Sequence, residues 1–349
     1  MKLIESEVEY LPQDKGLEGV YKQIEKCGRV SYKSEDKITK DSAEPFVKRM
    51  IDSHHGAVLE HGTVYLDYKI IPVNSAQKNK ILKEGAYSLY AKNDYEPSTL
   101  VALLSYLNFD CSPFSKVVLV EAKDSYPHVY ITTNMRVLED RKLTNALKHL
   151  CSPTELHEKR YTFKFTCSRA IANELIRHRA FSFMQESQRF VNYSKEKFGN
   201  EITFIKPSWY RENQLPIELP VAQNSNENGA VFYERPYKAY WIDTDADGYD
   251  WYKEDFFVHS CQTAEQCYFL MLEDDATPQQ ARDVLPNATK TELVMTGFAS
   301  DWRYLLDLRL FGKTGNPHPD MVDLMKKLQG VAEEAGIWDD IMKYKSKFD

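Results

Sequence analysis

The stretch YTFKFTCSRAIANELIRHRAFSFMQESQRF, from Tyr161 to Phe190, decides the fold of this chain. Its first six residues alternate in the way that is typical of a half-buried strand. The following CSRAIANELIRHR places Ile171, Leu175 and Ile176 on or near one face, which predicts a helix over 167–179. The chain then leaves this predicted helix through a dense run of charged and amide side chains.

Shorter patterns predict elements on the N-terminal side of this stretch. Ser42 to Met50 is typical of a helix, with Ser42 as a candidate cap, and Val64 to Ile70 alternates like a strand, which puts His61 at a strand entrance. From about 71 to 157 the pattern is irregular. It holds the strand-like VVLVEA and VYITTN and the helical RKLTNALKHL. We interpret this part as a long insertion or small subdomain.

On the C-terminal side, a second irregular stretch runs over about 207–250 and is interpreted as a surface excursion. From Trp251 onward the chain is expected to be mostly helical. Thr277 to Gln280 matches a capping box with Pro278 in the first turn, and Pro286 marks the end of that helix. A further helix is predicted from about Lys290 to Leu310.

Composition indicates a globular protein and excludes several classes. The 349 residues are 42% hydrophobic and include 5 Trp, 22 Tyr and 17 Phe, enough for a sizeable core. The net charge of −7 argues against a dedicated nucleic-acid binder, although not against a local cationic pocket. Neither a signal peptide nor a run of about 20 apolar residues is visible, so we expect a cytoplasmic protein without a membrane partner.

Metal-binding patterns are weak, and we expect no metal site. The cluster of His54, His55, Glu60 and His61 fits neither H-E-x-x-H nor H-x-x-E-H. Asp243 to Glu254 matches the pattern of a calcium loop, but the chain has no second loop to pair with it. The alternative is an acidic loop whose carboxylates favour the start of the following helix. The sequence leaves calcium binding open.

The segment from Arg177 to Phe190 carries the candidate chemistry. It contains three arginines, one histidine, two serines and two glutamines within fourteen residues. Arginine is favoured where planar phosphate or carboxylate groups must be held by two parallel hydrogen bonds. The segment therefore predicts a nucleotide pocket. The structural alternative is a helix end whose arginines pair with local acids such as Glu174 and Glu186.

This segment resembles the signature of the flavin-dependent thymidylate synthases, R-H-R followed by seven residues and S, with Ser187 in the last place. Glu60-His61 resembles the family's E-H motif, and Ala281 to Pro286 resembles its A-R-x-x-L-P. The stretch from Ser300 to Arg309 is similar to a late helix that ends in L-x-L-R. The four motifs occur in the family's order. The resemblance covers about 54–70, 161–207 and 251–328.

The resemblance implies an α+β fold with a central β-sheet and packed helices. It implies a single catalytic domain over 1–349 that carries insertions at about 71–157 and 207–250. The implied activity is a methyl transfer that converts dUMP to dTMP. Methylenetetrahydrofolate supplies the carbon, and reduced FAD, which NADPH regenerates, supplies the hydride. The family also implies a homotetramer whose active sites are shared between subunits.

The resemblance assigns roles to individual residues. Arg309 matches the catalytic arginine that polarises the uracil ring by a fixed charge. Ser187 is assigned to binding rather than covalent attack, because the sequence shows no adjacent base. The implied dUMP-binding residues are Glu174, Arg177, Gln185, Ser187, Gln188, Arg189 and Arg282. The implied FAD-binding residues are His61, Arg177, His178, Arg179, Gln185 and Tyr304.

The chain also departs from the family pattern. Met184-Gln185 stands where Asn-Glu is common, Glu174 where an uncharged amide is usual, and Tyr304 where Asn or His is frequent. Pro317 to Met321 replaces the family's A-Q-x-E-I. Two alternatives therefore remain open. One is a flavin- and nucleotide-binding homologue with a changed methyl-transfer reaction. The other is a non-enzymatic nucleotide- or RNA-binding protein, which the net charge disfavours.

Overall fold

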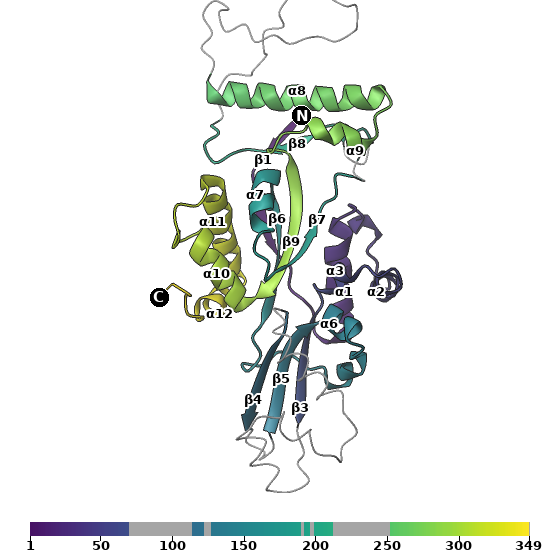
Figure 1. The fold of residues 1–349 in the computed structure, drawn as a ribbon, viewed down its shortest axis with the longest axis vertical. Helices are drawn as coiled ribbons and strands as arrows, with labels where there is room; N and C mark the ends of the chain where they lie inside the picture. The colour runs from purple at the N-terminus through teal and green to yellow at the C-terminus, as the bar shows by residue number, and fades with distance from the viewer. Residues whose placement is uncertain (70–113, 122–126, 190–191, 196–198, 212–251, 349) are drawn as a thin grey trace, which may run out of the picture. The chain divides into compact units, whose positions relative to one another are not determined.

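The computed structural model describes residues 1–69, 114–121, 127–189, 192–195, 199–211 and 252–348 (Figure 1). Backbone contacts divide the chain into two compact units. The main unit comprises Ser6–Ser187 and Lys290–Asp349, and the side unit comprises Met1–Glu5 and Gln188–Thr289. Both helices and sheets are present, which confirms the predicted α+β class. The prediction of one domain with two insertions stays a prediction.

A four-stranded antiparallel sheet forms the centre of the main unit, in the order β2, β6, β9, β7. The strands are β2 (Glu7–Tyr10), β6 (Arg160–Ser168), β7 (Ser182–Gln185) and β9 (Lys290–Phe298). The two central strands pair over their full length, from Arg160 opposite Phe298 to Ser168 opposite Lys290. The strand predicted over 161–166 is thereby confirmed.

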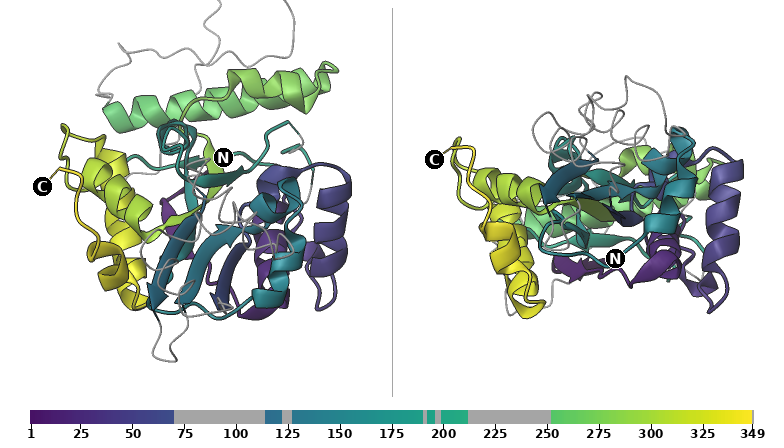
Figure 2. Two further views of the ribbon diagram at one scale, coloured as in Figure 1. Left: turned by 60° about the horizontal axis from the view of Figure 1, so that its bottom comes forward. Right: turned by 90° about the horizontal axis from the view of Figure 1, so that it is seen from below.

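Each face of this sheet is covered by helices (Figures 1 and 2). Phe163, Leu293 and Met295 share one hydrophobic cluster with the helices on one face. On the opposite face Val294 packs against Cys27 of the long N-terminal helix. The helices of the first face are α7 (Arg169–Leu175), α10 (Ala299–Arg309), α11 (Pro319–Glu334) and α12 (Trp338–Met342), and the helix of the second face is α1 (Gly16–Val30).

A second, three-stranded antiparallel sheet also belongs to the main unit, in the order β3, β5, β4. These strands are β3 (Thr63–Lys69), β4 (Lys116–Glu121) and β5 (Pro127–Asn134). They confirm the strand predicted at 64–70 and the two predicted within 71–157. The described part of that stretch therefore shares a sheet and a hydrophobic cluster with the N-terminal elements. Four helices pack with this sheet: α2 (Ala43–Asp52), α3 (Gly56–Leu59), α6 (Met135–Asp140) and the short 3-10 helix η3 (Thr144–His149). A further 3-10 helix, η1 (Glu35–Lys37), lies between α1 and α2 in the chain.

Three predictions of local structure are wrong. Residues 290–298, predicted as helix, form β9, because this segment is buried on both faces between β6 and β7 and so lacks strand-like alternation. The helix predicted over 167–179 is shorter, since β6 continues to Ser168 and α7 ends at Leu175. Ser42 precedes α2 as predicted but does not cap it. Its hydroxyl donates to the Glu25 carboxylate at 2.8 Å.

The side unit contains a long helix and a short parallel strand pair. Its elements are β1 (Lys2–Ile4), β8 (Thr203–Ile205), α8 (Lys253–Glu273), α9 (Pro278–Ala281) and the 3-10 helix η5 (Arg282–Val284). Half of the predicted capping box is present: the Thr277 amide donates to the Gln280 side chain at 2.9 Å, while the Gln280 amide donates to the Thr277 carbonyl at 2.9 Å, and Pro278 lies in the first turn. Most of the predicted calcium loop, Asp243 to Asp247 included, lies outside the described residues.

An ion-pair network joins the end of β7 to the start of β9. The Lys290 ammonium lies 2.7 Å from Glu292 and 3.0 Å from Glu186, and Lys33 of the main unit also contacts Glu292. Burial alone would raise the pKa of Glu292, but the two lysines outweigh it and hold that pKa at about 2. The network holds the end of β7 in place, just before Ser187 in the chain.

We expect this network to make stability depend on acidic pH. A carboxyl whose pKa is about 2 in the folded state and near its ordinary 4.5 when unfolded stabilises the fold above pH 4.5. That contribution, on the order of 3 kcal/mol, is lost as the pH falls from about 4.5 to about 2. Urea unfolding should show Glu292→Gln strongly destabilised at pH 7 and less so near pH 3.5. The substitution of an exposed residue, Glu7→Gln, serves as control. If the difference in free energy of unfolding between wild type and Glu292→Gln does not change with pH, the lowered pKa assigned to Glu292 is wrong.

Candidate active site

The turn between α7 and β7 carries the Arg177-His178-Arg179 motif. Within it the Phe181 amide donates to the carbonyl of His178 at 3.1 Å. The Phe181 ring is buried and lies edge-on to Trp302 of α10, with 4.6 Å between ring centroids. It also lies against Gly297 of β9, where a Cβ atom would come within 2.5 Å of the ring. Overpacking of this kind costs roughly 1–3 kcal/mol, so the contact requires glycine.

Arg309, the last residue of α10, connects that helix to α7 and to the turn. Its Nε donates to Nε2 of His178 at 3.1 Å, and its Nη1 donates to the Glu174 carboxylate at 3.0 Å. Arg309 is 23% exposed and Glu174 is 28% exposed, so the group is partly open to ligands. We call Glu174, His178 and Arg309 the Arg309 centre. Three residues that the sequence assigned separately therefore form one cluster.

The imidazole of His178 is neutral at physiological pH. Burial and the adjacent Arg309 guanidinium both disfavour its protonated form and lower the pKa of His178 to about 4. Arg309 is therefore the cation of the pair, and Glu174 partly balances its charge. No hydrogen bond within the described ranges engages the second terminal amine of Arg309, Nη2.

Two further cations lie beside this centre. Arg177 and Arg179 are exposed, and the side chain of neither forms an ion pair or hydrogen bond with a residue that the structure describes. The structural alternative, a helix end whose arginines pair with Glu174 and Glu186, therefore fails for these two residues. Glu174 pairs with Arg309 and Glu186 with Lys290 instead. The arginines present unneutralised charge that suits an anionic ligand.

Strand β7, which follows the turn, positions two more of the predicted residues, Gln185 and Ser187. The side-chain amide of Gln185 donates to the Thr291 hydroxyl at 3.3 Å, which ties it to β9. Ser187 is held through its backbone, because its amide donates to the carbonyl of Ser31 at 2.9 Å. The hydroxyl of Ser187 thus stays available for the predicted contact with substrate.

Three predicted phosphate-binding residues belong to the side unit. Gln188 is buried, and its amide nitrogen has no hydrogen-bond partner in the described part of the chain. Arg189 is exposed and donates to Gln279 at 3.3 Å, while Arg282 is half-buried and lies 4.0 Å from Asp283. Their joint contact with a phosphate stays a prediction.

Two predicted flavin contacts, His61 and Tyr304, share no hydrogen bond or ring contact with the Arg309 centre in the described residues. His61 is fully buried, and its Nδ1 lies 2.8 Å from the Thr296 hydroxyl of β9. Burial and the nearby Arg160 guanidinium lower the pKa of His61 to about 3. Tyr304 stacks on Phe348 with 5.8 Å between ring centroids. The roles of His61 and Tyr304 toward flavin stay predictions.

Sequence patterns missed two groups of residues with strong electrostatics. The ion-pair network of Lys290 lies in a segment predicted as helix, where its pairing with Glu186 could not be inferred. Arg160 is fully buried at the start of β6. A single arginine before an alternating strand gives no signal of burial. Among the described residues, no cluster of His, Cys, Asp or Glu could hold a metal ion, and no helix is long and apolar enough to cross a membrane.

The fold and the site describe an α+β protein with an arginine, imidazole and carboxylate centre for an anionic ligand. The Thy1 family model, described as "Thymidylate synthase complementing protein", matches residues 113–331. The chain belongs to this family.

Three known proteins illustrate the similarity. A "Flavin-dependent thymidylate synthase" of Corynebacterium aurimucosum is 30% identical over 142 residues, 41% of this chain and 46% of that protein. A "Probable flavin-dependent thymidylate synthase" of Paramecium bursaria Chlorella virus 1 is 25% identical over 167 residues, 48% of this chain and 64% of that protein. The matched stretch thus spans about half the length of these relatives. The solved "UMP/dUMP methylase PolB" of Streptomyces cacaoi aligns over 99% of this chain and 98% of its own, at 13% identity, with a TM-score of only 0.38.

We expect Arg309→Met to raise the pKa of His178. The change removes the neighbouring cation and keeps an apolar stem, so only burial still lowers that pKa. The value should rise from about 4 toward the ordinary 6.5 without reaching it. An NMR titration of the histidine ring protons, with the signal assigned by loss in His178→Gln, measures the shift. The exposed Arg141→Met is the matched control, and an unchanged pKa in Arg309→Met would contradict the pairing.

Proposed function

We propose that this protein is a flavin-dependent thymidylate synthase. It converts dUMP to dTMP with a carbon from methylenetetrahydrofolate and a hydride from reduced FAD, which NADPH regenerates. The observation that carries the proposal is the Arg309 centre, because the motif arginine, histidine and Glu174 come together at the end of α10. Membership of the Thy1 family supports the same reaction class.

In the proposed reaction Arg309 acts as a fixed positive charge. Its Nε and Nη1 are held by His178 and Glu174, which leaves Nη2 to bind an oxygen of the uracil ring. Negative charge that develops on the ring imide is then stabilised without reorganisation of the arginine. The neutral His178 does not compete for this charge, since its pKa of about 4 keeps it unprotonated. Ser187, Gln188, Arg189 and Arg282 are the residues that the family resemblance assigns to binding the nucleotide.

The residues of the turn fit an anionic cofactor. Arg177 and Arg179 are exposed and unpaired within the described chain, and cations stabilise a negatively charged reduced flavin or a diphosphate. FAD, when bound, would supply the hydride. The residues proposed to hold it are His61, Arg177, His178, Arg179, Gln185 and Tyr304. We also propose a cytoplasmic homotetramer with sites shared between subunits.

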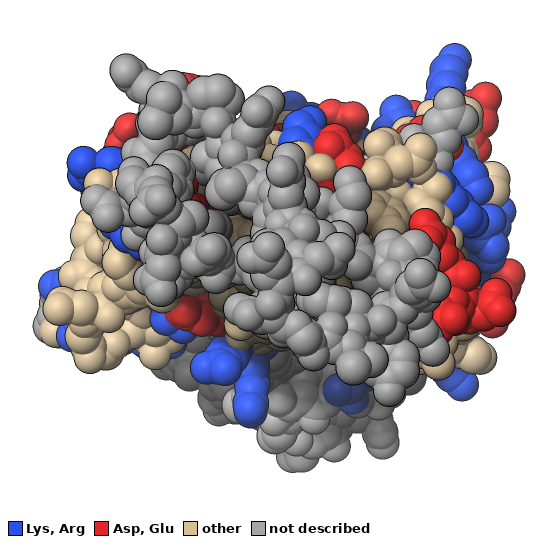
Figure 3. All heavy atoms as spheres, turned by 90° about the horizontal axis from the view of Figure 1, so that it is seen from above, with Lys and Arg blue, Asp and Glu red and all other residues tan. Residues whose placement is uncertain are grey.

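The alternative of a nucleic-acid-binding protein has less support from the surface. On the face drawn in Figure 3, the described lysines and arginines lie next to aspartates and glutamates and form no broad basic patch. A protein that binds nucleic acid through its phosphates needs cations spread along a face or a helix. The exposed cations of the motif turn instead form a local group of two, which suits a small anion.

The proposed reaction predicts dependence on every component. Purified protein incubated with dUMP, methylenetetrahydrofolate, NADPH and FAD should form dTMP, detected by chromatography. Omission of any one component should abolish the product. If dTMP does not form although FAD binds, the result favours the alternative that the protein is a flavin- and nucleotide-binding homologue with a changed methyl-transfer reaction. If FAD does not bind and leaves no protein-bound spectrum, the flavoenzyme proposal is wrong.

Arg309→Lys should abolish tritium release from dUMP labelled at the ring carbon while FAD still binds. A lysine keeps the charge, but a point charge cannot hold His178 and Glu174 and also reach the substrate. We expect a fall on the order of 100-fold or more, the scale of losing one fixed electrostatic donor. Flavin fluorescence reports cofactor binding separately from turnover. Arg141→Lys is the control, and unchanged tritium release in Arg309→Lys would refute the role of the guanidinium.

A further inference from the structure

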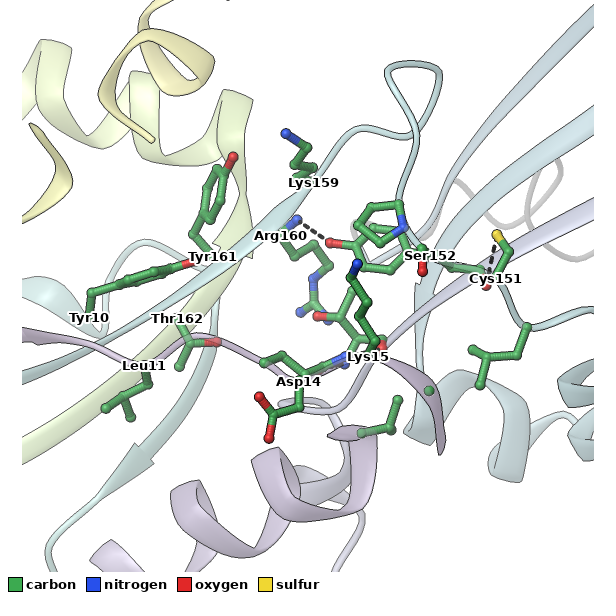
Figure 4. A pocket seen from close by; sticks show the side chains of 17 residues that line it. Tyr10, Leu11, Asp14, Lys15, Cys151, Ser152, Lys159, Arg160, Tyr161 and Thr162 are labelled. Carbon is green, nitrogen blue, oxygen red and sulfur yellow. Dashed lines mark hydrogen bonds between the residues drawn. The ribbon is translucent and has the colours of Figure 1, made fainter. Parts of the chain in front are cut away.

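A pocket lies in the main unit and includes none of the residues of the Arg309 centre. It has a volume of about 180 Å³, and residues from the ends of β2 and β6, the start of α1, strand β3 and the segment 150–153 line it (Figure 4). Its cationic residues are Lys15, Lys159 and Arg160, against the single carboxylate of Asp14. Lys159 lies 3.6 Å from the Asp340 carboxylate, so the cations of the lining without an ion pair in the described residues are Lys15 and Arg160.

Arg160 is the most unusual residue of this lining. It is 6% exposed, and its side-chain bonds go to the Glu60 carbonyl at 3.0 Å and the Ser182 hydroxyl at 3.1 Å. Its Nε has no hydrogen-bond partner, and no carboxylate forms an ion pair with it in the described residues. Burial lowers the pKa of Arg160 to about 10. Arg160 therefore carries a buried positive charge on which the Glu60 and Asp301 carboxylates act without forming an ion pair, and such a charge is costly without a closer anion.

Other donors converge on the same space. The Tyr65 hydroxyl accepts a hydrogen bond from the Arg160 amide at 3.2 Å, so its own proton is left to donate. Burial raises the pKa of Tyr65 to about 12, which keeps that proton in place. Helix α1 begins at Gly16 without a side-chain cap from Lys15, and a Cβ atom on Gly16 would meet nothing within 4 Å. Uncapped amides at a helix start favour an anion.

The size and the walls of the pocket restrict the ligand. Cavities of about 150 Å³ hold one benzene ring, whereas pockets for larger ligands measure roughly 300–1,000 Å³. A pocket of about 180 Å³ thus holds one ring with a small substituent, and neither a whole nucleotide nor FAD. Leu11, Val20, Leu150 and Pro153 and the rings of Tyr10 and Tyr161 supply apolar and aromatic walls.

We infer that this pocket binds a small aromatic carboxylate, with the ring against the tyrosine and aliphatic walls and the carboxylate toward Arg160, Tyr65 and Lys15. The binding is independent of the proposed thymidylate synthase reaction, because the lining includes none of the residues assigned to dUMP or FAD. A carboxylate has two acceptor oxygens, which match the few free donors better than the more numerous acceptors of phosphate.

Calorimetry with benzoate as the probe tests the inference on the full chain. We expect saturable binding with a dissociation constant of about 1 mM or lower. Benzamide has the same shape without the charge and should bind at least about tenfold more weakly, the loss expected for a charge-assisted contact. Inorganic phosphate should neither bind as well nor displace benzoate. Equal binding of benzoate and benzamide, or tighter binding of phosphate, would overturn the inference.

Two variants separate charge from space. Lys15→Gln removes an exposed cation of the lining and should weaken benzoate about fivefold, as expected for an exposed charge. Ser152→Trp should block the pocket and abolish binding without changing its charge. Lys22→Gln, on helix α1 but outside the lining, should bind like wild type. Arg160 itself is left unchanged, because its bonds to Glu60 and Ser182 make a folding defect the expected result of its removal. Wild-type affinity in both Lys15→Gln and Ser152→Trp would refute the site.

Discussion

The contact between the Phe181 ring and the backbone of Gly297 is the constraint on which the candidate active site depends. Because no side chain intervenes, the turn after α7 lies directly on the central strand β9. The same ring touches Trp302 of α10, so α10 and the turn are fixed against one another. Arg309 at the end of α10 therefore reaches His178 and Glu174 without any rearrangement. A packing contact in the core thus sets the geometry of a charged cluster near the surface.

The fold could be predicted from the sequence where polar and apolar residue types alternate or recur with the period of a helix, even in an element as buried as β6. Strands β6 and β3 and helix α2 keep a readable alternation or periodicity and were predicted. Strand β9 was predicted as helix, because Leu293, Val294 and Met295 are apolar in succession and a short apolar run has no distinguishing period. Helix α7 was predicted too long, since the charged residues after Leu175 fit a last helical turn as well as the tight turn they form.

The candidate site could be predicted as a set of residues but not as a set of contacts. Similarity of motifs singled out Glu174, His178 and Arg309, and the structure joins them by hydrogen bonds. Nothing in the sequence indicated that Glu174, which replaces an uncharged amide, would bind Arg309. The buried charges of Arg160 and Lys290 could not be predicted either, because burial depends on strand neighbours far away in the chain. The net charge of −7 likewise gave no sign of these local cations.

The hydrogen bond from Arg309 to His178 also fixes the tautomer of the imidazole. Since an arginine Nε can only donate, Nε2 of His178 must be the unprotonated, accepting nitrogen. With a pKa of about 4, the ring is neutral throughout the physiological range, so its single proton resides on Nδ1. That nitrogen is a permanent donor. Any group that binds there must present a lone pair, and this selectivity does not vary with pH between about 5 and 9.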